Sequence, residues 1–217
     1  MDVVLFNPAP RSGKQVQRRV ELPLSLLCPA TPLDRQGYRI KIIDEFANPN
    51  WRNELLQAID LKPICFGVTS MTGPQILHAL EGCRLVKERH PDVPIVWGGI
   101  HASLLPEQTL QHPYVDIVVV GEGEATFAEL VQALESHAPL KGILGLSYKE
   151  NGKIHHNGSR PFFNLDEQPL LSYHLVEMRH YRRRLFGIDH ISFNSSRGCT
   201  FRCSFCWDPV MHKRKWR

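Results

Sequence analysis

Ile117-Val118-Val119-Val120-Gly121 is a continuous apolar run that ends in glycine, and Pro94-Ile95-Val96-Trp97-Gly98 has the same form. Strands that are covered on both faces have no polar side, so they are apolar throughout, as is typical of a parallel sheet between layers of helices. The two runs therefore predict buried parallel strands whose carboxyl ends carry glycine loops.

The first 138 residues show an alternation of predicted strands and helices around these two runs. Strand patterns lie at 3–6, 38–43, 64–68, 93–97 and 116–120, and helical spacing lies at 51–61, 75–90, 104–111 and 125–136. Residues 22–35 also have helical spacing, but Pro23, Pro29 and Pro32 predict a broken or kinked helix. Residues 11–19 are polar and predict a loop. The alternation predicts an α/β fold, a doubly wound five-stranded parallel sheet of flavodoxin-like or Rossmann-like type, with the flavodoxin-like strand order 2-1-3-4-5 favoured.

Beyond residue 138 the alternation stops. Residues 143–148 and 153–156 flank Asn151-Gly152, which favours a hairpin turn. Residues 160–175 form a linker that contains proline, residues 181–186 have weak helical spacing, and residues 188–194 predict a strand. We expect three units: residues 1–138, a hairpin and linker at 139–187, and the start of another domain at 188–217.

Three cysteines, Cys199, Cys203 and Cys206, follow that last strand in the spacing C-x3-C-x2-C. In a reducing compartment so tight a group indicates metal binding rather than disulfides. Three thiolates can hold three irons of a 4Fe-4S cluster and leave the fourth iron open to a substrate. A zinc site with His212 as fourth ligand is the alternative. The scattered Cys28, Cys65 and Cys83 predict small buried side chains.

Composition limits the function classes. Apolar residues make up 42% and charged residues 22% of the chain, as in soluble globular proteins, and we expect a cytoplasmic protein with no membrane span. Residues 179–217 carry a net charge of +8 and the rest −4. Such a basic end suits nucleic acid, an anionic cofactor or the surface of another domain. We do not expect nucleic acid as a partner, because the segment lacks the pattern of an RNA-binding platform, and a solvated basic helix at 179–184 is at least as good an interpretation.

Polar and glycine-rich loops follow three of the predicted strands. The carboxyl ends of parallel strands form the ligand-binding edge of a doubly wound sheet, so these loops are candidates for binding. No G-x-G-x-x-G follows the first strand and no G-K-[ST] occurs, which disfavours NAD and ATP in their usual modes. The loops are Thr69-Ser70-Met71-Thr72-Gly73, Gly98-Gly99-Ile100-His101 and Gly121-Glu122-Gly123-Glu124.

Together with Asn7-Pro8-Ala9-Pro10 and Arg197-Gly198-Cys199, these segments resemble the cobalamin-binding radical S-adenosylmethionine (SAM) family over the whole chain. The resemblance implies a cobalamin domain followed by the first strand of an incomplete (β/α) radical SAM barrel. The cobalamin-binding positions that it implies are Asn7, Pro8, Thr69, Ser70, Met71, Thr72, Gly98, Gly99, His101, Gly121, Glu122, Gly123 and Glu124.

The same resemblance implies an activity. Cys199, Cys203 and Cys206 would hold a 4Fe-4S cluster, Phe205 would pack near the adenine of SAM, and cleavage of SAM would give a radical that attacks a small-molecule substrate. The implied reaction is methyl transfer, with ring closure or rearrangement as the alternative, and the implied electron donor is a flavodoxin or ferredoxin.

Two departures from the family pattern matter. There is no D-x-H-x-x-G, the segment that gives other cobalamin proteins an axial histidine, so His101 either approaches the cobalt or orders its loop. The barrel is incomplete, so we expect a fragment without turnover of its own; a non-catalytic cobalamin module with a vestigial cluster loop is the rival reading. Asn7 and Ser70 stand where a methylthiolating enzyme acting on RNA would have cysteines, which argues against that class.

Overall fold

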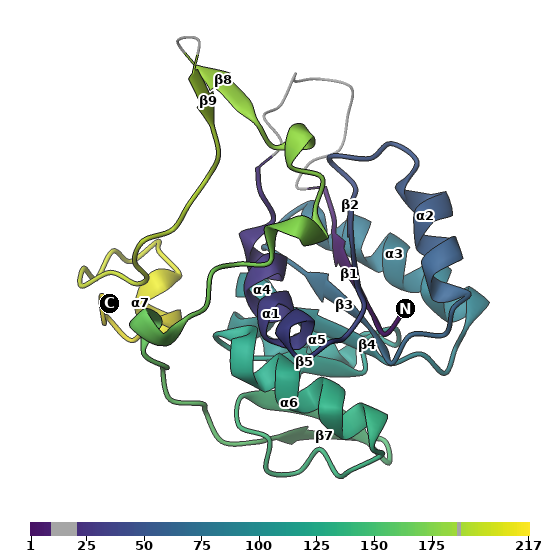
Figure 1. Ribbon diagram of the computed structural model, residues 1–217. Coiled ribbons are helices and arrows are strands. Elements are labelled where there is room, and N and C mark those ends of the chain that lie inside the picture. The colour runs from purple at the N-terminus through teal and green to yellow at the C-terminus, as the bar shows by residue number, and fades with distance from the viewer. Residues whose placement is uncertain (10–20, 186–187) are drawn as a thin grey trace.

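The computed structural model describes residues 1–9, 21–185 and 188–217, so the loop expected at 11–19 lies outside the described residues. A seven-stranded sheet in the order β2-β1-β3-β4-β5-β6-β7 forms its centre, and helices cover both faces (Figure 1). The strands are β1 (Val3–Asn7), β2 (Ile40–Asp44), β3 (Cys65–Thr69), β4 (Ile95–Gly98), β5 (Ile117–Val119), β6 (Leu146–Glu150) and β7 (Lys153–His156).

The first five strands are parallel and follow the order 2-1-3-4-5, which confirms the flavodoxin-like prediction. Val3 of β1 pairs with Ile40 of β2 on one side and with Cys65 of β3 on the other. The chain thus leaves β1 toward one edge of the sheet and returns to its other side. The switch point of this topology, where ligands bind outside the strand ends, lies between β1 and β3.

The predicted hairpin is present, but it belongs to the main sheet. Strand β6 pairs antiparallel with β5, with Ile117 opposite Tyr148, and β7 continues the sheet beyond it. The expectation of five strands is corrected to seven. Alternation within a hairpin does not show which edge it joins, whereas the free edge of β5 offers unpaired N–H and C=O groups that a further strand can satisfy.

Two helix layers enclose the sheet (Figure 1). Helices α1 (Leu24–Arg35) and α6 (Gly123–Glu135) pack on the face that includes Leu5, Val96 and Val119, while α2 (Trp51–Ile59) and α3 (Gln75–Arg89) pack on the opposite face. The helix expected at 104–111 is present as α5 (Pro106–Gln111), which begins at Pro106, and a further short helix that was not expected, α4 (Gly99–Leu104), precedes it.

Helix α1 runs unbroken through Pro29 and Pro32, so the expectation of a broken helix is wrong. Each proline inside a helix costs about 3 kcal/mol, and each buried aliphatic side chain contributes about 1.5–3 kcal/mol. Leu26, Leu27 and Leu33 are buried against the sheet, and their burial offsets the cost. Local propensity is overridden by tertiary packing.

The segment after the sheet differs most from expectation. It contains the short 3-10 turns η1 (Leu165–Glu167), η2 (Tyr173–Leu175) and η3 (Met178–His180), a two-stranded hairpin of β8 (Arg183–Leu185) and β9 (Ile188–His190), and α7 (Asp208–Met211). The helix expected at 181–186, and with it the basic helix at 179–184, is wrong. The strand expected at 188–194 ends at His190 and pairs with β8. Strand pairing depends on two segments, so the periodicity of one segment alone does not predict it.

No helix within the described ranges is both long and apolar enough to cross a bilayer.

Candidate functional site

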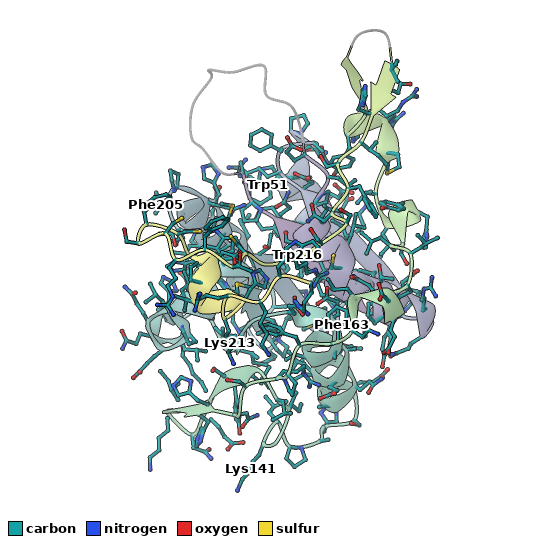
Figure 2. All side chains as sticks on the ribbon, turned by 90° about the vertical axis from the view of Figure 1, so that its left-hand side faces the viewer. Trp51, Lys141, Phe163, Phe205, Lys213 and Trp216 are labelled. Atoms are coloured by element: carbon teal, nitrogen blue, oxygen red, sulfur yellow. The ribbon has the colours of Figure 1, made fainter. Side chains whose placement is uncertain are left out.

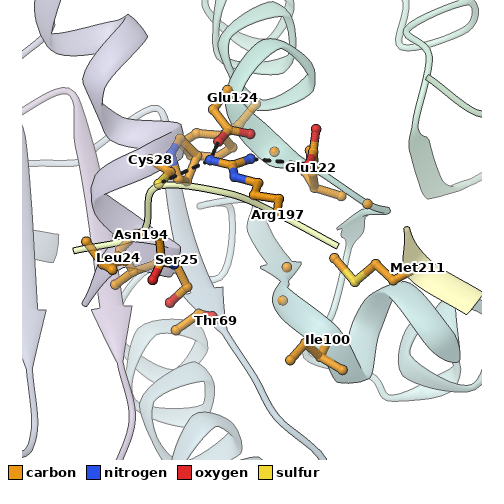
Figure 3. A pocket seen from close by; sticks show the side chains of 18 of the residues that line it. Leu24, Ser25, Cys28, Thr69, Ile100, Glu122, Glu124, Asn194, Arg197 and Met211 are labelled. Carbon is orange, nitrogen blue, oxygen red and sulfur yellow. Dashed lines mark hydrogen bonds and ion pairs between the residues drawn. The ribbon is translucent and has the colours of Figure 1, made fainter. Parts of the chain in front are cut away.

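A cavity of about 430 Å³ lies at the carboxyl ends of the parallel strands. Its floor comes from the sheet face that α1 and α6 cover, and its far wall comes from the segment that carries the cysteines (Figure 3). Its volume is within the range of ligand pockets, about 300–1,000 Å³. Residues that line it include Leu5, Leu24, Ser25, Cys28, Gly67, Thr69, Val96, Gly98, Gly99, Ile100, Val119, Gly121, Glu122, Glu124, Phe127, Asn194, Arg197, Trp207, Met211 and His212.

Gly98 and Gly121 leave open space at the edge of this cavity. A Cβ atom added at either position would meet no heavy atom within 4 Å. Backbone therefore stays uncovered where β4 and β5 end, and a bulky ligand can approach it closely. Cobalamin is such a ligand, and these residues fit it: an apolar floor, bare backbone at two strand ends, and a location beside the topological switch point.

Gly99 has a different role from its neighbour. Its φ is +86°, and a Cβ there would lie 2.7 Å from the carbonyl oxygen of Ser70. Replacement Gly99→Ala should therefore lower the free energy of unfolding by about 2 kcal/mol or more, because it combines backbone strain with a contact to backbone that cannot move aside. Urea denaturation would measure this, with Gly98→Ala as the matched control. Equal stability of the two variants would contradict this assignment.

Two glutamates at the N-terminal end of α6 bind an arginine from the far wall: Glu122 directly before the helix and Glu124 in its first turn. Arg197 lies between them in Figure 3, with its guanidinium 2.6 Å from Oε1 of Glu124 and 3.4 Å from Oε1 of Glu122. The same guanidinium lies 3.2 Å from the side-chain oxygen of Gln168 and 3.6 Å from the sulfur of Cys28. This contact closes one side of the cavity with paired charges.

Cys28 lines the cavity and is half-buried, whereas Cys65 and Cys83 are fully buried as expected. Burial, and after it the nearby Glu124 carboxylate, raise the pKa of Cys28 to about 11, while Arg197 opposes the rise. The thiol is therefore protonated at neutral pH.

Alkylation should reveal this difference. In the anaerobic chain, iodoacetamide should modify the exposed Cys203 at pH 7 and modify Cys28 much more slowly. The rate at Cys28 should rise by about tenfold per pH unit up to pH 9, because only the thiolate reacts and its fraction grows in that proportion below the pKa. Peptide mass spectrometry would follow each site. Equal rates at Cys28 and Cys203 at pH 7 would contradict the protonated, enclosed thiol.

The structure brings about half of the predicted cobalamin positions to the cavity. Phe205, which was expected near the adenine of SAM, does not line the cavity. The predicted cobalamin positions that line it are Thr69, Gly98, Gly99, Gly121, Glu122, Gly123 and Glu124; those that do not are Asn7, Pro8, Ser70, Met71, Thr72 and His101.

Several of the latter order the loops around it instead. Asn7 donates to Asp44 at 3.1 Å, and Tyr181 donates to the same carboxyl oxygen at 3.0 Å. Burial raises the pKa of Asp44, and the hydrogen bonds from Asn7, the Phe46 amide and Tyr181 oppose that rise.

Neighbouring loop residues hold one another in the same way. The carbonyl of Pro8 accepts a hydrogen bond from Gln75, whose side-chain oxygen accepts one from the backbone amide of Met71. Nδ1 of His101 lies 3.1 Å from the Thr72 hydroxyl, and burial lowers the pKa of His101. These contacts favour the loop-ordering alternative for His101 over cobalt ligation.

The cysteine segment is not arranged as a formed metal centre. Across residues 1–9, 21–185 and 188–217, no group of three His, Cys, Asp or Glu side chains is placed to hold a metal ion. The amide of Cys206 donates to the carbonyl of Cys203 at 3.1 Å, and Nδ1 of His212 lies 3.0 Å from a carboxyl oxygen of Asp208. Three thiols suit an iron–sulfur cluster by their chemistry. Phe205, 92% exposed, points away from the body of the molecule (Figure 2).

Sequence patterns gave no reason to select Leu24, Ser25, Cys28 and Met211, which lie around the cavity in Figure 3. Arg197 carried part of the family resemblance, but no role at a cavity was predicted for it. One signal was available for Gly67, because a glycine in the interior of an apolar strand often marks a close approach. A Cβ at Gly67 would lie 2.6 Å from a methyl carbon of Leu5. The absence of a side chain at Gly67 therefore leaves room for Leu5 in the floor of the cavity.

Fold and site together define a doubly wound α/β protein with a ligand cavity across the carboxyl ends of its strands. The chain belongs to the B12-binding domain family, whose model matches residues 19–131, and its resemblance to the cobalamin-binding radical SAM family is confirmed.

Two curated relatives illustrate the range of that family. The uncharacterized methyltransferase PH0819 of Pyrococcus horikoshii is 37% identical over 221 residues, which cover 100% of this chain and 47% of the relative. The anaerobic magnesium-protoporphyrin IX monomethyl ester cyclase of a Synechocystis species is 27% identical over 211 residues, covering 95% of this chain and 42% of the cyclase. The chain thus spans less than half the length of either protein.

Solved structures show the same architecture. The cobalamin-dependent SAM radical enzyme OxsB, with aqua-cobalamin and SAM bound, superposes with a TM-score of 0.77 at 26% identity and covers 100% of this chain and 29% of its own. The radical SAM methyltransferase TsrM of Kitasatospora setae, with cobalamin and a 4Fe-4S cluster bound, shares the fold with a TM-score of 0.71 at 20% identity, covering 100% of this chain and 43% of that protein.

Proposed function

We propose that this chain is the cobalamin-holding part of a cobalamin-dependent radical SAM enzyme. The observation that carries the proposal is the cavity with bare backbone at Gly98 and Gly121, which lies at the switch point of a chain whose residues 19–131 match the B12-binding family. Fold alone does not imply function, whereas a cavity of this shape in this family does support one.

Each part of the cavity has a task in this proposal. Gly98 and Gly121 admit the ligand to backbone N–H and C=O groups, and Thr69 offers a hydroxyl at the end of β3. Leu5, Val96 and Val119 provide a dry floor that excludes water from the bound group. Bound cobalamin would supply a cobalt centre that carries a methyl group between donor and acceptor.

The cysteine segment would supply the second cofactor site. Cys199, Cys203 and Cys206 are the donors for a 4Fe-4S cluster, which would provide one electron for cleavage of SAM, drawn from a flavodoxin or ferredoxin. Because the described thiols do not converge, we propose that binding of iron and sulfide brings them together. Phe205 would then turn toward the adenine of SAM.

Methyl transfer to a small-molecule substrate in the cytoplasm is the reaction that we propose for the longer enzyme. The 37% identity to a methyltransferase across the full chain favours it, while the 27% identity to a cyclase keeps ring closure as the second candidate. For the organisation, we propose that residues 1–138 with the joined hairpin hold cobalamin, the linker follows, and residues 188–217 begin the radical SAM domain.

Anaerobic reconstitution tests the two cofactors separately. The chain, mixed with hydroxocobalamin and then with iron and sulfide, should leave gel filtration with about one cobalamin and with the broad absorption of an iron–sulfur cluster. A folded chain that elutes without cobalamin would refute the cobalamin assignment. Bound zinc with no cluster absorption would refute the cluster and favour the zinc alternative.

A further inference from the structure

Two arginines close the base of the cysteine loop. The backbone amides of Arg197 and Arg217 each donate to the carbonyl of the other residue at 2.9 Å. The chain between them contains all three cysteines of the motif and α7. A reciprocal pair of this kind fixes the two ends of the loop against each other, as in a narrow antiparallel bridge.

Both arginine side chains then reach the same acidic loop at the end of β5. Arg197 binds Glu124 and Glu122 as described above, and Arg217 pairs with Glu122. The arginines also lie against aromatic rings, with the guanidinium carbon of Arg197 5.4 Å from the ring centre of Phe163 and that of Arg217 4.3 Å from that of Phe162. We call these four charged residues, Glu122, Glu124, Arg197 and Arg217, the arginine latch.

The latch is largely shielded from water. The side chains of Glu122 and Glu124 are 9% and 10% exposed, and those of Arg197 and Arg217 are both 19% exposed. Its two positive and two negative charges balance, so removal of one leaves an uncompensated charge in a poorly hydrated place. Exposed ion pairs contribute little to the free energy of folding, and the arginine latch differs from them in both burial and geometry.

Its position links the two parts of the molecule. Glu122, Glu124 and Arg197 all line the cavity, and Arg197 lies two residues before Cys199. A ligand in the cavity therefore contacts the loop that holds the latch, and the latch holds the base of the cysteine loop.

We propose that Arg197 and Arg217 are positioning residues that fasten the cysteine loop to the wall of the cavity, so that ligand occupancy and the order of the loop are coupled. The identity of the ligand as cobalamin rests on the proposed function; the latch itself does not. Coupling between two sites is reciprocal, so a ligand that orders the loop must bind more weakly when the loop is released.

Hydrogen–deuterium exchange of the complete chain tests the proposal. Arg197→Gln and Glu124→Gln should each speed exchange in peptides from 197–217 by about tenfold or more. The double variant should add little to Arg197→Gln, because that replacement alone already removes the Arg197–Glu124 ion pair. Exchange in α3 should not change. Arg160→Gln is the matched control, because Arg160 is 20% exposed and pairs with Glu129 outside the latch. Arg217→Gln gives a second, independent release if Arg197→Gln does not fold.

The same exchange experiment with added ligand distinguishes a positioning role of the latch from a role in stability alone. Hydroxocobalamin should slow exchange in peptides from 197–217 of the wild-type chain, should do so much less in Arg197→Gln, and should bind that variant at least about fivefold more weakly. Unchanged exchange in Arg197→Gln and Arg217→Gln, with α3 intact, would overturn the latch. If the variants release the loop but the folded wild-type chain binds no cobalamin, the latch stands and the proposed function fails.

Discussion

Gly98→Val should abolish retention of cobalamin while leaving the fold intact. The backbone of Gly98 is extended, with φ −139° and ψ −169°, and valine adopts this conformation readily. Its Cβ would meet no protein atom within 4 Å, so the added side chain would begin in the open end of the cavity. We expect cobalamin affinity to fall by at least about 100-fold, while the free energy of unfolding changes by about 0.5 kcal/mol or less.

Spectroscopic titration with hydroxocobalamin and urea denaturation measure these two quantities independently. Gly158→Val is the matched control, because Gly158 does not line the cavity and its added Cβ would meet only a methyl carbon of the exposed Leu144. That variant should bind cobalamin as the wild-type chain does. Undiminished affinity in a folded Gly98→Val would place the ligand elsewhere.

Replacement of any one cysteine of the motif should remove the iron–sulfur cluster and spare cobalamin. Cys199→Ala, Cys203→Ala and Cys206→Ala each leave two thiolates where three irons need ligands. We expect iron and sulfide bound after reconstitution to fall by about tenfold or more relative to the wild-type chain.

Cys65→Ala supplies the comparison. Cys65 is buried in β3 and has no part in the motif, so this variant should retain the full iron content. Cobalamin retention should be equal in all of these variants. Full iron content in Cys203→Ala would contradict the assignment of that thiol as a ligand.

The parallel sheet could be predicted because its information is local. Runs such as Ile117 to Val119 are apolar on both faces, and only strands covered on both sides require this. The edge of the sheet that the hairpin joins could not be predicted. Tyr148 pairs with Ile117, and neither segment contains a local pattern that identifies the other as its partner. The continuity of helix α1 was not predicted for a related reason. Its prolines are visible in the local sequence, whereas the burial that stabilises the helix depends on distant segments.

The candidate site divides in the same way. Glycine and polar loops after strands predicted Gly98, Gly121 and Glu124 at the cavity, because strand-end loops of a parallel sheet share one edge. The partner of Glu124 could not be predicted, since Arg197 lies 73 positions away and nothing in its own segment indicates a contact with Glu124. Asn7 is the last residue of β1 and His101 follows β4, yet their side chains bond to Asp44 and Thr72 rather than line the cavity.

Paired charges set the character of this cavity wall. Two glutamates facing a ligand without partners would repel the phosphate of a nucleotide tail and would be costly to bury. With Arg197 and Arg217 bound to them, the wall is neutral, and opening it exposes charges of both signs. The balance fits a wall that can close on an uncharged or anionic group.

A crystal structure of the chain grown with hydroxocobalamin tests the central claim most directly. The account predicts electron density for cobalamin across the ends of β3, β4 and β5, in contact with the backbone of Gly98 and Gly121. Part of the ligand should lie inside the cavity, against the floor that Leu5 and Val96 help to form. Density for cobalamin on any other surface, with this cavity left to solvent, would contradict it.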